Sequence, residues 1–172
     1  MGVASHYRVS TSWPPAPGAP PGFATWLPQV GARTVAGLVG RGAGLTPSGD
    51  DALAGALLVA HALGAGEALA DAVRARLGAT TAVSAALLDA AADGYAARPV
   101  VALVDATVAT DPAGVRRALP AVLAIGHTSG ADTVTGVRAA LNTLRAAVGC
   151  SAGGQGSHLS TQLELPTRRS AA

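Results

Sequence analysis

The apolar residues in the middle of the chain recur at helical spacing. A first helix is predicted where Pro47 takes the first helical position after a Thr46 cap, with its end near Gly64. Proline suits the first turn because its missing N–H is not needed there. The core-facing positions of this helix are Leu53, Leu57 and Ala60.

Two further helices follow at short intervals. One is predicted from about Glu67 to Gly78, with its acidic residue first and Arg74 and Arg76 in the last turn, as the helix dipole favours. The next is capped by Thr80 or Thr81 and ends at Gly94. Their apolar faces are predicted to be Leu69, Val73 and Leu77 in one and Val83, Leu87 and Leu88 in the other.

The rest of the middle section is also helical in pattern. Pro99 starts an apolar stretch that ends near Asp111, and residues 115–125 predict either a helix interrupted at Pro120 or two short turns. Alternating strand patterns are nearly absent, so the sequence predicts an all-α domain. The clearest apolar face belongs to the last helix, at Val134, Val137, Leu141, Leu144 and Val148.

Length and composition predict one domain with two tails. The 172 residues are 49% hydrophobic, enough for a single buried core. Prolines crowd residues 1–27, and residues 149–172 are rich in Gly, Ser and Thr, so both segments are expected to be flexible. The helical domain is therefore placed at residues 28–148.

Charge and rare residues exclude several classes of protein. The chain has no lysine, which excludes P-loop ATPases and Schiff-base enzymes that use their own lysine. The charge of +2 comes without a basic stripe and aromatics are only 3%, so we expect no nucleic-acid partner. The lone Cys150 fits a reducing cytoplasm, and the uncharged stretch of residues 52–66 is shorter than the ~20 residues of a membrane span. We expect a soluble, cytoplasmic protein.

One pattern, Ser-Gly-x-Asp-x-aliphatic-x-Gly, occurs at residues 48–55 and again at 129–136. Both copies read as helix starts, which offer unpaired N–H groups and the positive end of the dipole to an anion. If the helices cross at Gly55 and Gly136, Asp51 and Asp132 come close together. Such a carboxylate pair could hold Mg²⁺ or share a proton. Alternatively, each acid only stabilises its own helix start.

Other candidates surround these motifs. The glycines of residues 40–44 precede a helix as a phosphate-binding loop would, although a flexible connection has the same composition. His127 could transfer a proton or bind an anion, or be a solvated loop residue. Asp50 has no counterpart in the second motif and is expected at the surface or as a cap. Thr81 and Ser84 could add hydroxyls or serve only packing and capping.

Three segments, residues 44–51, 80–85 and 125–132, closely resemble the AllH-type family, formerly a domain of unknown function. Its members are described as the third subunit of oxamate carbamoyltransferase. The resemblance covers about residues 30–148. Family members carry an additional region ahead of the first motif, which here is replaced by the proline-rich lead. Two explanations stay open, a chain truncated at its N-terminus or a wrongly chosen start.

The resemblance implies carbamoyl transfer, as in oxalurate plus phosphate giving oxamate and carbamoyl phosphate. It also implies a small anionic substrate, other carbamoyltransferase subunits as partners and a role in allantoin or purine catabolism. Two alternatives stay open: a non-catalytic, anion-binding scaffold subunit, and a Mg²⁺-dependent helical hydrolase resembling ADP-ribosylglycohydrolases. The implied catalytic residues are His127, Asp132 and Asp51, and the implied ligand-binding residues are Arg41, Gly42, Gly44, Thr46, Ser48, Gly49, Asp50, Thr81, Ser84, Thr128, Ser129 and Gly130.

Overall fold

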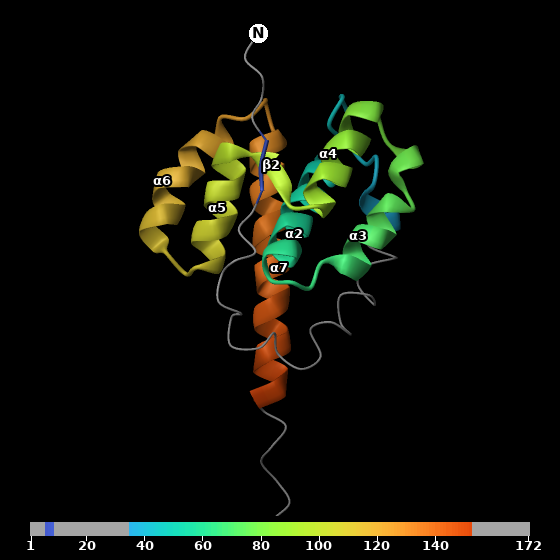
Figure 1. Cartoon of the computed structure of the whole chain (residues 1–172). Coiled ribbons are helices and arrows are strands. Elements are labelled where there is room, and N and C mark those ends of the chain that lie inside the picture. The colour runs from blue at the N-terminus through green and yellow to red at the C-terminus, as the bar shows by residue number, and fades with distance from the viewer. Residues whose placement is uncertain (1–5, 9–34, 153–172) are drawn as a thin grey trace, which may run out of the picture.

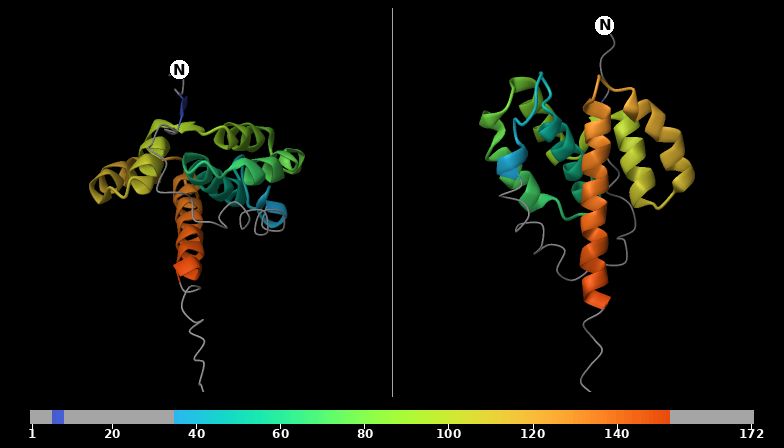
Figure 2. Two further views of the ribbon diagram at one scale, coloured as in Figure 1. Left: turned by 60° about the horizontal axis from the view of Figure 1, so that its bottom comes forward. Right: turned by 180° about the vertical axis from the view of Figure 1, so that it is seen from behind.

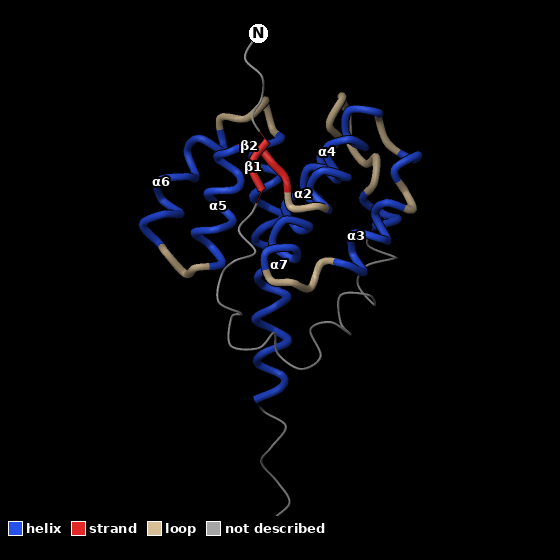
Figure 3. Tube along the Cα trace, viewed as in Figure 1, coloured by secondary structure: helices blue, strands red, loops and turns tan. Residues whose placement is uncertain are grey.

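The computed structural model describes residues 6–8 and 35–152, and this part of the chain is an all-α domain, as predicted (Figure 1). A short two-stranded sheet is added to the helices (Figure 3). The elements in chain order are β1 (His6–Arg8), α2 (Ser48–Ala62), α3 (Glu67–Arg74), a 3₁₀ turn (Leu77–Ala79), α4 (Ala82–Ala92), β2 (Tyr95–Ala97), α5 (Arg98–Val108), α6 (Pro112–Leu123) and α7 (Ser129–Ala152).

The long helix α7 forms the axis of the domain. The pair α5 and α6 lies on one side of it, and α2, α3 and α4 lie on the other, while the C-terminal part of α7 extends away from the body (Figures 1 and 2). The core lies where these groups meet. Its fully buried side chains include Leu57, Leu58, Val59, Leu88, Val104 and Val122.

Helices α2 and α7 cross at the two glycines of the repeated motif. A Cβ added at Gly55 would lie 2.2 Å from the carbonyl oxygen of Thr133, and one at Gly136 would lie 1.8 Å from that of Ala52. Such distances leave no room for a side chain at either position. The crossing that the repeat predicts is therefore present, and both positions require glycine.

The helix starts follow the capping signals with one shift. Helix α2 begins at Ser48, so Pro47 is its N-cap residue rather than its first helical residue. The Pro47 carbonyl accepts hydrogen bonds from the amides of Asp50 and Asp51, at 2.9 and 3.2 Å. Thr81 caps α4, as one of the two predicted options, by accepting a hydrogen bond of 3.0 Å from the Ser84 amide.

Helix α6 runs without a break through Pro120, so the predicted interruption is wrong. A proline within a helix removes the hydrogen bond to the carbonyl four residues earlier, here that of Arg116. Both residues lie on the exposed side of α6, where water can hydrate a carbonyl. Val122 follows Pro120 by two residues and so lies on the opposite side of α6, where it is fully buried and holds this end of the helix on the core.

The predicted apolar face of α4 is only partly correct. Leu88 is buried, but Val83 and Leu87 are 47% and 40% exposed and flank a shallow groove. The buried positions are Ser84, Leu88, Ala91 and Ala92, which lie on one side of the helix and form the stripe that packs inward. Ser84 belongs to this stripe and donates a buried hydrogen bond to Asp50, whereas Val83 and Leu87 lie on the solvent side of α4.

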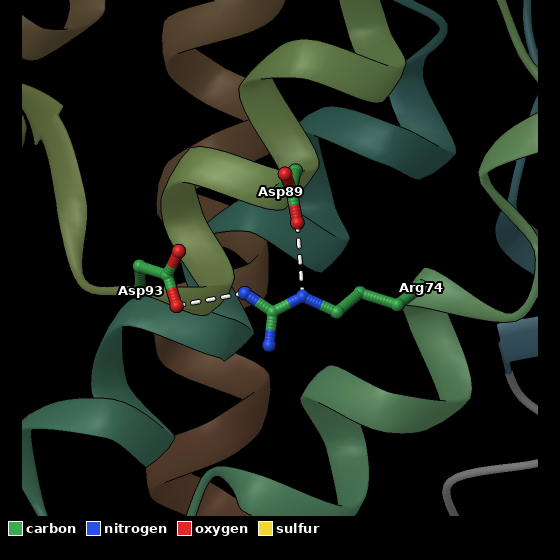
Figure 4. Close-up of polar contacts among 3 residues, drawn as sticks. All are labelled: Arg74, Asp89 and Asp93. Carbon is green, nitrogen blue, oxygen red and sulfur yellow. Dashed lines mark hydrogen bonds and ion pairs between the residues drawn. The ribbon is translucent and has the colours of Figure 1, made fainter.

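Helices α3 and α4 are also joined at their surface. The guanidinium of Arg74 donates to Asp89 at 2.9 Å and to Asp93 at 2.7 Å (Figure 4). All three side chains are at least 38% exposed, so each ion pair contributes little to stability.

Two described elements include residues outside the predicted domain of residues 28–148. Within the proline-rich lead, residues 6–8 form β1, which pairs antiparallel with β2 in the register Tyr7 with Ala96. At the other end, α7 continues to Ala152, beyond the predicted boundary at residue 148. The remaining parts of the two predicted tails lie outside the described residues. None of the helices in the described part combines the length and apolar character needed to cross a membrane.

Candidate functional site

The starts of α2 and α7 lie side by side because the two helices cross about two turns further on, at Gly55 and Gly136. The hydroxyl oxygens of Thr46 and Ser129 are 3.0 Å apart, which joins the segment before α2 to the first residue of α7. We call the group of Thr46, Asp51, Ser129 and Asp132 the α2–α7 junction. It brings together residues from both copies of the repeated motif.

Asp51 is buried at the junction with one oxygen unpaired. Its side chain is 8% exposed, and Oδ2 accepts no hydrogen bond from any residue that the structure describes. Burial raises the pKa of Asp51, and the charges of Asp132 and Asp50 raise it further. The hydroxyls of Ser129 and Thr46 act in the opposite direction, but burial outweighs them.

Asp132, which is half-buried on α7, also has one unpaired oxygen. Its Oδ2 atom is also buried and has no hydrogen-bond partner within residues 35–143. Buried acceptors are almost always paired in folded proteins, and one that is not requires an explanation. Two such oxygens, on carboxylates close enough to affect each other, are typical of a site that receives a hydrogen donor or a cation.

Most backbone amides at the two helix starts are already used by the chain. The amide of Gly49 donates to the Arg41 carbonyl at 2.8 Å, and that of Gly130 donates to Ile125 at 3.1 Å. The Asp132 amide donates to Thr128 at 2.9 Å. None of the hydrogen bonds among the described residues uses the amides of Ser129 and Ala131. These two remain available at the positive end of α7.

The glycines of the motifs serve packing more than ligand access. A Cβ at Gly49 would lie 2.1 Å from the Leu38 carbonyl oxygen, and one at Gly130 would lie 1.9 Å from that of Val122. In the preceding loop, a Cβ at Gly42 would meet the Ser48 amide at 2.7 Å. Only Gly44 of these four faces open space, with a positive φ of 91°.

Asp50 is not at the surface, so that expectation is wrong. Its side chain is 1% exposed and accepts hydrogen bonds from the Gly40 amide at 2.8 Å, the Ser84 hydroxyl at 2.7 Å and the Thr80 hydroxyl. Three donors compensate a buried carboxylate, which explains why it can face inward. Asp50 thereby fixes the glycine-rich loop and the start of α4 against α2.

Thr80 and Thr81 complete this support. Thr81 caps α4 and also donates its hydroxyl to the Leu45 carbonyl of the loop. The sequence suggested Thr80 only as an alternative cap of α4, yet its hydroxyl donates a hydrogen bond to Asp50. The signal that could have identified it is the Gly-Asp-Asp sequence, since adjacent helical acids point in different directions and one of them requires partners inside the protein.

The other predicted residues lie around the junction with exposed side chains. His127 and Thr128 stand on the turn before α7, and Ser48 and Arg41 are at and before the start of α2. Within the described residues, no three or more His, Cys, Asp or Glu side chains are grouped as a metal site would require. The two junction carboxylates thus stand as a pair.

Comparison with known proteins locates the chain in a family. No solved structure matches it. The family model AllH, described as oxamate carbamoyltransferase subunit AllH, matches residues 38–141, which is more than half of the chain. The matched segment contains the glycine-rich loop, both repeated motifs and the whole α2–α7 junction. The chain therefore belongs to the AllH family of oxamate carbamoyltransferase subunits.

Proposed function

We propose that this chain takes part in carbamoyl transfer by binding a phosphate-bearing or carboxylate ligand, such as carbamoyl phosphate, oxamate or oxalurate, at the α2–α7 junction. The observation that carries the proposal is the pair of buried, unpaired oxygens on Asp51 and Asp132 at two adjoining helix starts. A protein that needed these carboxylates only for capping would leave them in water or pair them.

The groups at the junction suit the parts of such a ligand. The free amides of Ser129 and Ala131 lie at the positive end of α7 and would face its phosphate or carboxylate. Arg41 is exposed on the loop before α2 and is the proposed positive charge for the anionic part of the ligand. The loop itself is held in place by the buried Asp50, so the site is preorganised before the ligand arrives.

The transfer needs one proton to be removed. In the direction of oxamate carbamoylation, the oxamate nitrogen attacks the carbonyl carbon of carbamoyl phosphate, the bond from that carbon to the phosphate oxygen breaks, and the nitrogen loses a proton. Asp51 is the proposed base, because its raised pKa makes it a stronger base than an ordinary carboxylate. His127, exposed at the rim, is placed to pass the proton on to solvent.

Other carbamoyltransferase subunits are the proposed partners. The family description names a subunit, which implies that the complete enzyme has further chains. Whether the reacting atoms meet on this chain or on a partner is decided by comparing binding with turnover. Ligand binding by the isolated chain, together with turnover of the assembled enzyme that junction variants leave unchanged, would identify an anion-binding scaffold.

The test is the thermal stability of the purified chain with carbamoyl phosphate, oxamate, oxalurate, phosphate and Mg²⁺ in turn. A ligand that binds only the folded state raises the melting temperature. At a free ligand concentration of a hundred times Kd, it adds about 2.7 kcal/mol to the free energy of unfolding. We expect a rise with carbamoyl phosphate or oxamate that is lost in Asp51→Ala and Asp132→Ala. Asp71→Asn, which neutralises an exposed carboxylate on α3, is the matched control and should keep the full rise.

A rise that persists in both junction variants would place the ligand elsewhere on the chain. A rise with Mg²⁺ alone, lost in the same variants, would favour the metal-dependent hydrolase instead. The transfer role itself is tested by adding the partner subunits and measuring carbamoyl phosphate formation from oxalurate and phosphate.

A further inference from the structure

We propose that the outer face of α4 pairs with the same face of a second copy of this chain. The large side chains of Val83, Leu87 and Tyr95 are 47%, 40% and 41% exposed. Together with Ala86 and Ala90 they line one shallow groove, which we call the α4 groove. Single exposed apolar residues are common on protein surfaces, whereas a contiguous group of them marks a contact with another molecule.

The α4 groove is the side of the helix that the fold leaves uncovered. Helix α4 packs on α2 through its other side, which carries the buried Ser84 and Leu88. None of the elements in the described part of the chain covers Val83 or Leu87 on the outer side (Figures 1 and 2). These side chains stay in contact with water in a single chain, and a second apolar surface would remove them from it.

The groove is complementary to itself. Val83 and Leu87 are four residues apart and form a ridge along α4, while Ala86 and Ala90 form a strip of small side chains beside it. A two-fold axis that runs along α4 exchanges the two sides of this face. In such a parallel pairing, the ridge of each copy lies over the alanine strip of the other, as in ridges-into-grooves packing. An antiparallel pairing would set ridge against ridge and leave a gap between the alanine strips.

The charges beside the groove permit this pairing. Asp89 and Asp93 are the acids of α4 and its C-cap, and both are already paired with Arg74, at 2.9 and 2.7 Å. The approach of a second copy therefore adds no unpaired carboxylate to the contact. The groove alone is smaller than the roughly 800 Å² per partner that a stable interface buries, so we expect a reversible dimer with a dissociation constant of about 10–100 μM.

The experiment is sedimentation equilibrium of the full chain over a concentration range of about 1 to 500 μM, which spans weak association. The wild type should change from monomer to dimer across this range. Leu87→Glu should be monomeric throughout, because it places a charge in the apolar contact. Leu123→Glu is the matched control: Leu123 is 49% exposed on α6, outside the groove, and its replacement should leave the dimer unchanged.

Ala86→Leu separates specific packing from general stickiness. It makes the surface more apolar but fills the alanine strip, so it should weaken the dimer about tenfold. A stronger dimer in this variant would overturn the pairing of ridge and strip. The melting temperature of each variant verifies that it is folded.

Two other results would overturn the proposal. One is a wild-type chain that stays monomeric over the whole range, or a dimer that Leu87→Glu leaves intact. The other is a monomeric chain whose association with the remaining carbamoyltransferase subunits is lost in Leu87→Glu but kept in Leu123→Glu. That result would assign the α4 groove to a partner subunit. Neither result bears on ligand binding at the α2–α7 junction, which is measured separately.

Discussion

Replacing Gly136 with alanine should separate the two helices that build the junction. The added Cβ would lie 1.8 Å from the carbonyl oxygen of Ala52, and the carbon atoms of the same residue are 2.6 and 2.9 Å away. All three are backbone atoms of α2, so no side chain can rotate away. Restoring an ordinary contact requires α2 and α7 to move apart by about 1 Å or more, which disturbs a well-packed core.

The expected cost follows from two opposing effects. Overpacking of this kind costs about 1–3 kcal/mol, and since no relaxation is available we take the upper end, while alanine regains up to about 1 kcal/mol of helix propensity over glycine. The net loss is about 2 kcal/mol, or roughly 8 °C in melting temperature for a domain of this size. The same separation should lower the pKa of Asp51 towards its usual range, because Asp132 moves away.

The assay is urea unfolding followed by circular dichroism, with thermal melting as a second measure. Gly37→Ala is the matched control, because Gly37 is also helical and a Cβ there meets nothing within 4 Å. It should leave stability unchanged or raise it slightly. If Gly136→Ala were as stable as the wild type with the same dependence on urea, the close crossing of α2 and α7 would be wrong.

Three further changes test other parts of the structure. Asp51→Asn should raise the melting temperature at pH 7, because the raised pKa of Asp51 means that the folded state disfavours the ionised carboxylate. This cost disappears once the pH falls below the usual carboxyl range, so thermal melts at several pH values should show the gain vanishing at about pH 3. Ser84→Ala should lower the free energy of unfolding by about 1.5–3 kcal/mol in denaturant unfolding, because it removes a hydrogen-bond donor from the buried Asp50. Ser48→Ala is the control at an exposed serine, and an equal loss there would contradict this reasoning. Arg74→Gln should lower the free energy of unfolding by less than about 1 kcal/mol, since both ion pairs of Arg74 are exposed. In 1 M salt the variant and the wild type should be equally stable. A larger loss, or one that salt does not remove, would mean that Arg74 has another role.

The local sequence determined the helices and their order. Apolar spacing, caps such as Thr81 and glycines at helix ends act over a few residues, so they can be read along the chain. The repeated motif also carried tertiary information, since a glycine at the same offset in two helix starts predicts their crossing. The repeat therefore predicts that Asp51 and Asp132 lie close together, and whether they bind a ligand stays a prediction.

Only the tertiary structure decided which of two neighbouring residues is buried. The local sequence does not distinguish Asp50 from Asp51. Asp50 is almost fully buried because Gly40, Thr80 and Ser84, which belong to other segments, donate hydrogen bonds to its carboxylate. On α4 the polar Ser84 is likewise buried while the apolar Leu87 is 40% exposed. Gly49 and Gly130 likewise turned out to be sites of close backbone packing, because their neighbours, at Leu38 and Val122, are brought there by the fold. Burial and hydrogen-bond partners depend on contacts between distant segments, and a pattern read along one segment does not contain them.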